Sequence, residues 1–216
     1  MESKTKREQR IEGTKENIVN VAGDLFAMKG IANVAFDDIA KEAGYSRTTV
    51  YSHFSSKDDI TNYIVLRTMN IVLKSIRKVV KSTVQADGQF RLLCYELVAL
   101  CDDNPFFFKC MQEYIDASPE GRKNNPVLEE IYQVGEKLNE EFARMLAGGV
   151  EQGKFRSDLN VLPTGMILWS CLTSLISVMH NKRQYIEADM LTAEEFLDYG
   201  FALILRTVLK EGVNIG

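Results

Sequence analysis

The chain has 216 residues, of which 45% are hydrophobic, and it carries a net charge of −4 with only four prolines. A chain of this size can bury one substantial core plus a small additional domain, and the scarcity of proline favours helices. Residues 1–57 hold nine Lys or Arg against eight Asp or Glu, whereas residues 58–216 hold seventeen against twenty-two. This distribution argues against a nonspecific nucleic-acid coat and predicts a near-neutral N-terminal part on an acidic body.

The four cysteines show no CxxC spacing, and the chain starts with charged residues instead of an apolar leader. We therefore expect a cytoplasmic protein with reduced thiols. Cys94 and Cys101 are seven residues apart and share one helix face, where two buried apolar side chains are favoured over a redox switch. The only histidines, His53 and His180, lie far apart in the sequence, so neither a metal site nor a cofactor is expected.

The first predicted helix begins after Thr14, a suitable N-cap, and ends at Gly30. Lys29 then places a favourable positive charge near the C-terminal end of this helix. The basic residues before it either follow DNA phosphates or form a solvated tail, and the sequence leaves both possibilities open: Lys4, Lys6, Arg7 and Arg10.

Residues 36–57 have the layout of a helix-turn-helix. A short helix spans about 37–43, Gly44 supplies a tight turn that a Cβ would resist, and Ser46 can cap the next helix. Ala40 is small enough for the two helices to cross closely. The second helix turns Val50 and Phe54 inward and leaves a polar outer face made of Arg47, Thr48, Thr49, Tyr51 and His53.

These residues resemble the TetR family of bacterial transcriptional regulators, with the strong match covering about residues 18–60. The matching positions are Ile18, Ala22, Leu25, Phe26, Gly30, Ile39, Ala40, Ala43, Gly44, Ser46, Thr49, Tyr51, His53, Phe54 and Lys57. Two positions depart from the family pattern. Ala35 and Phe36 stand where small hydroxyl residues are usual, so we expect Asp37 to take over capping at the loss of a phosphate contact. Thr48 replaces a frequent glycine and can touch a base.

The outer face of the second helix has the chemistry that major-groove recognition needs. Arg47 can reach a guanine edge or a phosphate, and the threonines can contact base edges. The resemblance implies phosphate contacts for the aromatic residues and for Lys57, although packing is an equal alternative for His53. The predicted DNA-binding residues are Tyr45, Ser46, Arg47, Thr48, Thr49, Tyr51, His53 and Lys57.

Helical periodicity continues to the C-terminus and predicts an all-α fold of about nine helices. The resemblance implies a DNA-binding domain over 1–57 and an effector-binding and dimerisation domain over 58–216. Ser56 caps a long fourth helix, Asp87-Gly88 marks a break, and residues 90–101 form the next helix. Pro105 opens a sixth helix, 118–126 is a polar loop, and residues 127–150 form a long amphipathic helix. Pro163 opens a helix to about 180, and Thr192 caps the last helix to about 210.

Two segments invite other interpretations. Residues 159–181 carry no charge and approach the length of a membrane span, but proline, glycine and several hydroxyl residues favour a fully buried helix in a subunit interface. Residues 148–155 resemble a phosphate-binding loop, yet Phe155 stands where Ser or Thr is required and no strand precedes them. We interpret this second segment as a helix stop followed by a turn.

The resemblance implies a homodimer that represses transcription from a palindromic operator and is released by a small effector, here a largely hydrophobic one. The predicted effector-pocket residues are Phe90, Tyr95, Phe107, Met111, Tyr114, Phe142, Met145, Met166 and Trp169. The predicted dimer-interface residues are Ser170, Ser174, Ser177, Phe196 and Leu203. Two alternatives remain: a regulator that senses oxidants or a protein partner, and a helical dimer that has lost DNA binding. No catalytic motif supports an enzyme.

Overall fold

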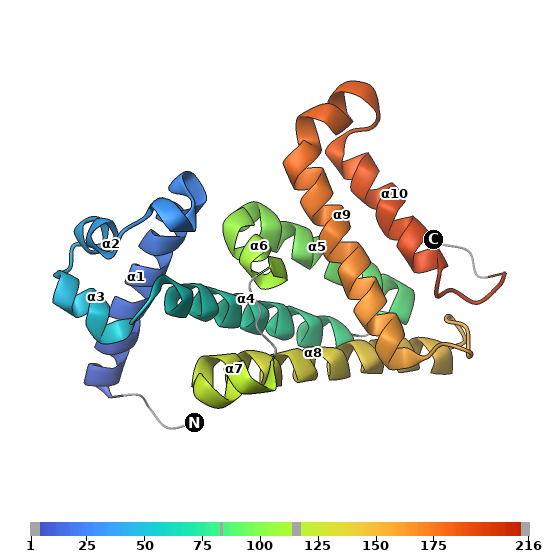
Figure 1. Cartoon of the computed structure of the whole chain (residues 1–216). Helices are drawn as coiled ribbons and strands as arrows, with labels where there is room; N and C mark the ends of the chain where they lie inside the picture. The colour runs from blue at the N-terminus through green and yellow to red at the C-terminus, as the bar shows by residue number, and fades with distance from the viewer. Residues whose placement is uncertain (1–4, 83, 114–117, 213–216) are drawn as a thin grey trace.

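The computed structural model describes residues 5–82, 84–113 and 118–212, and over these residues the chain is all-α, as predicted (Figure 1). The described part holds ten α-helices and one 3₁₀ helix, one α-helix more than expected. Their bounds are α1 (Lys6–Lys29), η1 (Ile31–Asn33), α2 (Phe36–Ala43), α3 (Arg47–His53), α4 (Lys57–Val80), α5 (Ala86–Asp103), α6 (Pro105–Glu113), α7 (Pro119–Asn124), α8 (Pro126–Glu151), α9 (Val161–Asp189) and α10 (Ala193–Arg206). We call α1 to α3 the head and α4 to α10 the body.

The first helix begins nine residues earlier than predicted. Thr5 is its N-cap: the Thr5 hydroxyl accepts from the Glu8 N–H at 3.3 Å, and the Glu8 carboxylate accepts from the Thr5 N–H at 2.8 Å. This reciprocal capping box satisfies two amide donors at the helix start. Thr14 lies inside α1, where its hydroxyl donates to the Arg10 carbonyl at 3.0 Å.

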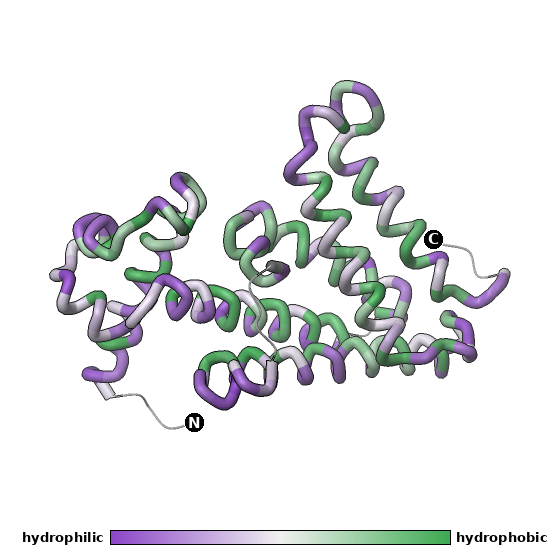
Figure 2. The backbone as a smooth tube through the Cα atoms, in the orientation of Figure 1, coloured by the Kyte–Doolittle hydropathy of each residue, from purple (hydrophilic) through white to green (hydrophobic). Residues whose placement is uncertain are grey.

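The long helix α4 leaves the head and runs through the body, with α8 lying along it (Figure 1). Ser56 caps α4 as predicted, accepting from the Asp59 N–H at 3.0 Å. Figure 2 shows hydrophobic segments gathered where the body helices meet, and polar segments at the outer turns. A buried carboxylate, Glu141 of α8, is held between Arg77 of α4 at 3.0 Å and Arg144 at 2.9 Å. The two cations compensate for removing this charge from water.

Several boundaries in the body differ from the prediction. The break precedes Ala86, and Asp87-Gly88 lies within α5, because the Gln152 side chain accepts from the Ala86 N–H at 2.9 Å and stabilises an earlier start. The polar segment after Ser118 contains the short helix α7. Ser118 is its N-cap, and the Ser118 hydroxyl accepts from the Gly121 N–H at 3.1 Å. The last helix ends at Arg206, not near residue 210.

The segment after α8 is a helix stop and a turn, as the sequence indicated. Gly153 adopts a left-handed φ of 68°, and the Phe155 N–H donates back to the Gly149 carbonyl at 3.0 Å. The Phe155 ring packs so tightly on Gly149 that an added Cβ would lie 2.1 Å from it. The turn is also tied to the C-terminal segment, because the Lys210 N–H donates to the Lys154 carbonyl at 2.9 Å.

Helix α9 is much longer than predicted and continues past a kink at Lys182 to Asp189. Among the described residues it is the one helix long and apolar enough to cross a membrane by length and composition, and it packs against α5, α8 and α10. The expectation that this helix is buried in a subunit interface stays a prediction, because the structure is that of a single chain. Large apolar side chains of α9 are exposed, namely Leu162, Met166, Ile167 and Val178.

Candidate nucleic-acid interface and cavities

The turn between α2 and α3 has the geometry that the sequence predicts. Gly44 adopts the left-handed conformation with φ 72° and ψ 27°, and the Tyr45 N–H donates to the Ala40 carbonyl at 2.9 Å. A side chain with a Cβ would resist this conformation. Ala40 is buried where the helices meet, and Asn17 of α1 donates its amide to the Ala43 carbonyl at 3.2 Å. These contacts fix α2 and α3 on α1.

Helix α3 is capped by Ser46, whose hydroxyl accepts from the Thr49 N–H at 3.1 Å and lies 2.8 Å from the Thr49 hydroxyl. Val50 and Phe54 are buried under the helix, whereas Arg47 and Thr48 are exposed on its outer face. The helix therefore presents charged and hydroxyl groups to solvent on one side and is anchored in the core of the head on the other.

Two residues of α2 hold side chains of α3. The Asp37 carboxylate contacts the Arg47 guanidinium through two nitrogens, at 3.2 and 3.3 Å, and the Phe36 ring stacks on Tyr51 at 4.5 Å between centroids. A hydrogen bond with Tyr51 and the charge of Asp37 raise the pKa of Arg47. The expected capping by Asp37 is wrong, since Asp38 accepts from the Ala35 N–H at 3.0 Å while Asp37 faces Arg47.

The remaining predicted phosphate contacts differ in their surroundings. Tyr51 is exposed, whereas Tyr45 and His53 are half-buried. The Lys57 ammonium donates to three backbone carbonyls, those of Ile31 at 2.6 Å, Val34 at 3.0 Å and Ala32 at 3.3 Å. An ammonium has three donors, so these bonds engage all of them. The structure thus places the Lys57 ammonium at the α1–α2 connection, and its predicted DNA contact stays a prediction.

A polar and aromatic junction joins the head to the body. The Tyr63 hydroxyl donates to Glu12 at 2.7 Å and to Glu16 at 3.0 Å, which ties α4 to α1. The Arg67 guanidinium forms a short ion pair with Glu16 and lies over the Phe107 ring, with 4.6 Å from Cζ to the centroid. Phe107, predicted in the effector pocket, is instead a buried element of this junction.

One cavity lies between α4, α6, α8 and α9 and has a volume of about 320 Å³. We call it the α8–α9 cavity. It brings together four predicted pocket residues, Met111, Phe142, Met166 and Trp169, and its wall also holds Met69, Ile131, Tyr132, Gly135, Glu136, Leu138, Asn139, Gly165 and Ser170. The prediction missed most of these residues because aromatic and methionine side chains were its only signal. It missed Met69 and Tyr132, which carry that signal, because the sequence does not show which faces of α4 and α8 meet α9.

Three further predicted pocket residues, Phe90, Tyr95 and Met145, do not line this cavity. Phe90 and Met145 are buried in the core, with 0% and 1% exposure, and their place in an effector pocket stays a prediction. Tyr95 is exposed on α5, where its hydroxyl donates to Asp198 of α10 in a short hydrogen bond and its ring packs edge-on against Phe201. The hydrogen bond with Asp198, together with partial burial, raises the pKa of Tyr95 to about 12. Tyr114 lies outside the described residues.

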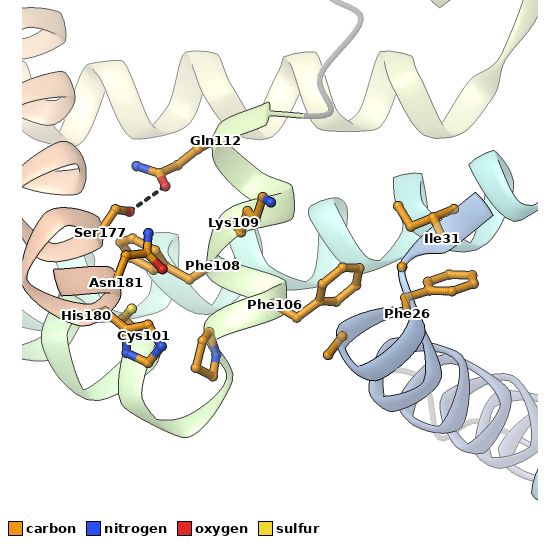
Figure 3. Close-up of a pocket in the computed structure, with 13 residues that line it drawn as sticks. Phe26, Ile31, Cys101, Phe106, Phe108, Lys109, Gln112, Ser177, His180 and Asn181 are labelled. Carbon is orange, nitrogen blue, oxygen red and sulfur yellow. Dashed lines mark hydrogen bonds between the residues drawn. The ribbon is translucent and has the colours of Figure 1, made fainter. Parts of the chain in front are cut away.

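A second cavity of about 480 Å³ opens between the head and the body, and we call it the junction cavity (Figure 3). Its head side is built from α1 and η1, through Phe26, Ala27, Gly30 and Ile31. Its body side is built from Cys101, Pro105, Phe106, Phe108, Lys109, Gln112, Ser177, His180 and Asn181. Across it, the Ser177 hydroxyl donates to the Gln112 amide oxygen at 2.8 Å. Ser177 therefore faces α6 of its own chain.

An apolar surface runs along α9 and α10. The small residues Ser170, Cys171 and Ser174 are exposed between larger apolar side chains, and Leu203 of α10 is exposed nearby on the helix that packs against α9. Phe196 is half-buried against the core. Such an apolar stripe around small residues lets a second helix pair approach closely.

The cysteines offer little redox chemistry. Cys94, Cys101 and Cys110 are buried and Cys171 is exposed. Burial raises the pKa of the Cys94 thiol and raises that of Cys101 to about 11, which keeps both thiols protonated and poorly reactive near neutral pH. Within the described ranges, no group of three or more His, Cys, Asp or Glu side chains is arranged to hold a metal ion.

Comparison with known proteins identifies relatives that share this helix-turn-helix. The family profile described as bacterial regulatory proteins, tetR family, matches residues 18–64. The HTH-type transcriptional repressor KstR2 of Rhodococcus jostii is 25% identical over 153 residues, which cover 69% of this chain and 71% of that protein. The crystal structure of the TetR-family regulator PfmR from Thermus thermophilus is 26% identical with a TM-score of 0.67, covering 88% of this chain and 97% of PfmR.

A further solved structure shares the fold alone. The regulator FadR from Bacillus subtilis, solved in complex with stearoyl-CoA, is 16% identical with a TM-score of 0.69, covering 92% of this chain and 99% of FadR. The capped helix-turn-helix and these relatives define the class of protein: a DNA-binding transcriptional regulator, not an enzyme. Within that class, residues 18–64 match the TetR family of bacterial regulatory proteins, and most of the chain is similar to regulators of that family.

Proposed function

We propose that the chain acts as a cytoplasmic homodimeric repressor that binds a palindromic operator through α3 and is released by a compact, largely hydrophobic ligand. The observation that carries this proposal is the exposed outer face of α3, where Arg47 and Thr48 project from a helix anchored by Val50 and capped by Ser46. An exposed polar face on a helix that is anchored in the core of the head is suited to major-groove contacts.

The proposed DNA contacts follow from exposure and charge. Arg47 is held by Asp37 in a solvent-exposed pair, which is worth little in free energy and yields readily to a guanine or a phosphate. The Arg47 guanidinium lies over the exposed Tyr51 ring, with 5.4 Å from Cζ to the centroid, and Thr48 lies on the outer face. We assign Lys57 to holding the α1–α2 connection, because its three donors are engaged with backbone carbonyls.

The test is selection of bound sequences from random duplex DNA with the wild-type chain, Arg47→Ala and Arg156→Ala. Arg156 is a matched control, since it is an exposed arginine paired with Asp158 at 3.1 Å, but it lies in the body. We expect a palindromic motif that Arg47→Ala relaxes at one position per half-site, by about 1–3 kcal/mol, and that Arg156→Ala preserves. Failure of any motif to be enriched would contradict the proposal.

The proposed dimer uses the apolar surface of α9 and α10. Leu203→Glu places a charge in that surface. Leu92→Glu on α5 is the matched control, because Leu92 is 44% exposed and Leu203 is 43% exposed. We expect light scattering to report a dimer for the wild type and Leu92→Glu, and a monomer for Leu203→Glu. A dimer that survives Leu203→Glu but dissociates with Leu92→Glu would move the interface to α5.

We assign the effector to the α8–α9 cavity. Its volume of about 320 Å³ lies at the lower end for small-molecule sites, and its wall is rich in methionine and aromatic side chains. The chain has a single tryptophan, and Trp169 lies in that wall, so its fluorescence reports occupancy. To shift the chain from 99% in the operator-binding state to 1%, the effector must bind the other state more tightly by about 5.5 kcal/mol.

The effector experiment titrates 1-octanol and 1-decanol against Trp169 fluorescence and against operator binding. Gly135→Leu fills the cavity, whereas Gly148→Leu adds the same side chain outside it. Both positions have room for a side chain, because an added Cβ would lie 3.7 Å from its nearest neighbour at Gly135 and 4.0 Å at Gly148. We expect at least one probe to change both signals in the wild type and in Gly148→Leu but not in Gly135→Leu. Ligand-induced release that persists in Gly135→Leu would exclude this cavity.

A further inference from the structure

The junction cavity has a wall from each part of the molecule. Phe26 of α1 and Phe106 of α6 face one another with ring centroids 6.1 Å apart, and Ile31 lies beside them, as Figure 3 shows. Phe26 and Phe108 are almost fully buried apolar lining residues. A molecule in this cavity would therefore contact the head and the body at the same time.

Among the described lining residues of this cavity, Lys109 is the charged side chain. Lys109 of α6 and His180 of α9 are exposed lining residues, and Gln112 and Asn181 add amide groups. The remaining ionisable lining group is the Cys101 thiol, which burial keeps protonated. The α8–α9 cavity is the opposite case, because its one charged lining side chain is the carboxylate of Glu136. The two cavities thus favour different ligands.

We propose that the junction cavity is a second small-molecule site, which takes an aromatic carboxylate with its ring on the Phe26–Phe106 wall and its anionic group toward Lys109 and His180. Its size suits one such molecule, since sites of this kind begin at about 300 Å³. Because part of the wall belongs to the head, occupancy is coupled to the orientation of the head. The ligand and the operator then change one another's affinity by the same factor.

The binding test uses isothermal titration calorimetry of the full chain with 3-phenylpropionate and its neutral analogue 3-phenylpropanol. We expect the carboxylate to bind about tenfold more tightly than the alcohol, as one charge-assisted hydrogen bond supplies. Lys109→Gln should remove most of this difference and leave the alcohol unchanged, whereas Lys137→Gln, an exposed lysine on α8, should preserve it. Equal affinity for the two probes, or no heat up to about 10 mM, would overturn the proposal.

The location test uses two cavity-filling variants. Ala27→Phe fills the junction cavity from an exposed position of α1 and should abolish binding of both probes, while Gly135→Leu in the other cavity should leave binding intact. Circular dichroism verifies that Ala27→Phe is folded, and Lys109→Gln tests the site independently. Binding lost with Gly135→Leu, or quenching of Trp169 by 3-phenylpropionate, would place the probe in the α8–α9 cavity and refute the junction site.

The coupling test adds saturating 3-phenylpropionate to the operator titration. We expect a change in operator affinity of about fivefold or more in the wild type and none in Ala27→Phe. Unchanged operator affinity in the wild type, with calorimetric binding intact, would refute the coupling while leaving the site. If no operator is found at all, the calorimetric tests still decide whether the site exists.

Discussion

The close approach of α1 and α6 at Gly23 gives the sharpest test of how the head is attached to the body. An added Cβ at Gly23 would lie 2.3 and 2.9 Å from two ring carbons of Phe107. Carbon atoms pack best at about 3.5–4.0 Å, so the ring would have to move by about 1 Å. Phe107 is only 4% exposed and is covered by Arg67, which leaves little room for that movement.

Two opposing terms set the magnitude for Gly23→Ala. Replacing glycine by alanine inside a helix stabilises it by about 1 kcal/mol, and overpacking a buried contact costs about 1–3 kcal/mol. Gly13 lies in the same helix with nothing within 4 Å of an added Cβ, so Gly13→Ala retains the favourable term alone. We expect Gly13→Ala to raise the free energy of unfolding by about 1 kcal/mol, and Gly23→Ala to be about 1–3 kcal/mol less stable than Gly13→Ala.

The assay is urea unfolding followed by circular dichroism at one fixed protein concentration, because association shifts the apparent stability. The double variant Gly23→Ala with Phe107→Leu removes the ring atoms that clash, so the two substitutions should be coupled by about 1 kcal/mol or more. Equal stabilisation by Gly13→Ala and Gly23→Ala, with no coupling to Phe107→Leu, would show that α1 and α6 are not packed as described.

Three further predictions concern separate contacts. Lys57→Met should lower the free energy of unfolding by about 1–3 kcal/mol in the same assay, because three carbonyls lose a charged donor, whereas Lys41→Met on the exposed side of α2 should be nearly neutral. Maleimide labelling of the native chain near pH 7.5 should modify Cys171 and spare the three buried thiols; fast labelling of a buried thiol would revive an oxidant-sensing role. The pKa of Tyr95 is raised from 10.0 to about 12, so the stability that Tyr95 adds over Tyr95→Phe is full below pH 10 and is lost as the pH rises toward 12. A difference that is constant through pH 12 would show that the bond to Asp198 is absent.

The sequence was sufficient for the head because its signals are local. Gly44 and Ser46 each determine the conformation of their own turn, and the structure has both as expected. The start of α1 was misplaced because Thr14 and Thr5 are both acceptable caps, and only Thr5 has a glutamate three residues later. That capping box is readable in the sequence, so this error was avoidable.

The cavities were less predictable because they depend on contacts between distant segments. Phe90, Phe107 and Phe142 look alike in the sequence, yet one is core, one joins the head to the body and one lines a cavity. Which of these a phenylalanine becomes depends on the packing angle of α4, α6 and α8, and no local pattern encodes that angle. The three carbonyl partners of Lys57 likewise lie more than twenty residues away from it.

The boundary proposed at residue 57 divides the chain by sequence motif, but the contacts of α4 argue that this helix belongs mechanically to both parts. Its first half holds α1 through Tyr63 and Arg67, and its second half holds α8 through Arg77. Arg67 also covers Phe107 of α6, so a shift of α6 would disturb the ion pair that fixes α1. The junction cavity lies beside this contact and shares α1 and α6 with it. We infer that a signal from the body reaches α3 through the packing of α6 on α1 and α4, and not through the connection at residue 57 alone.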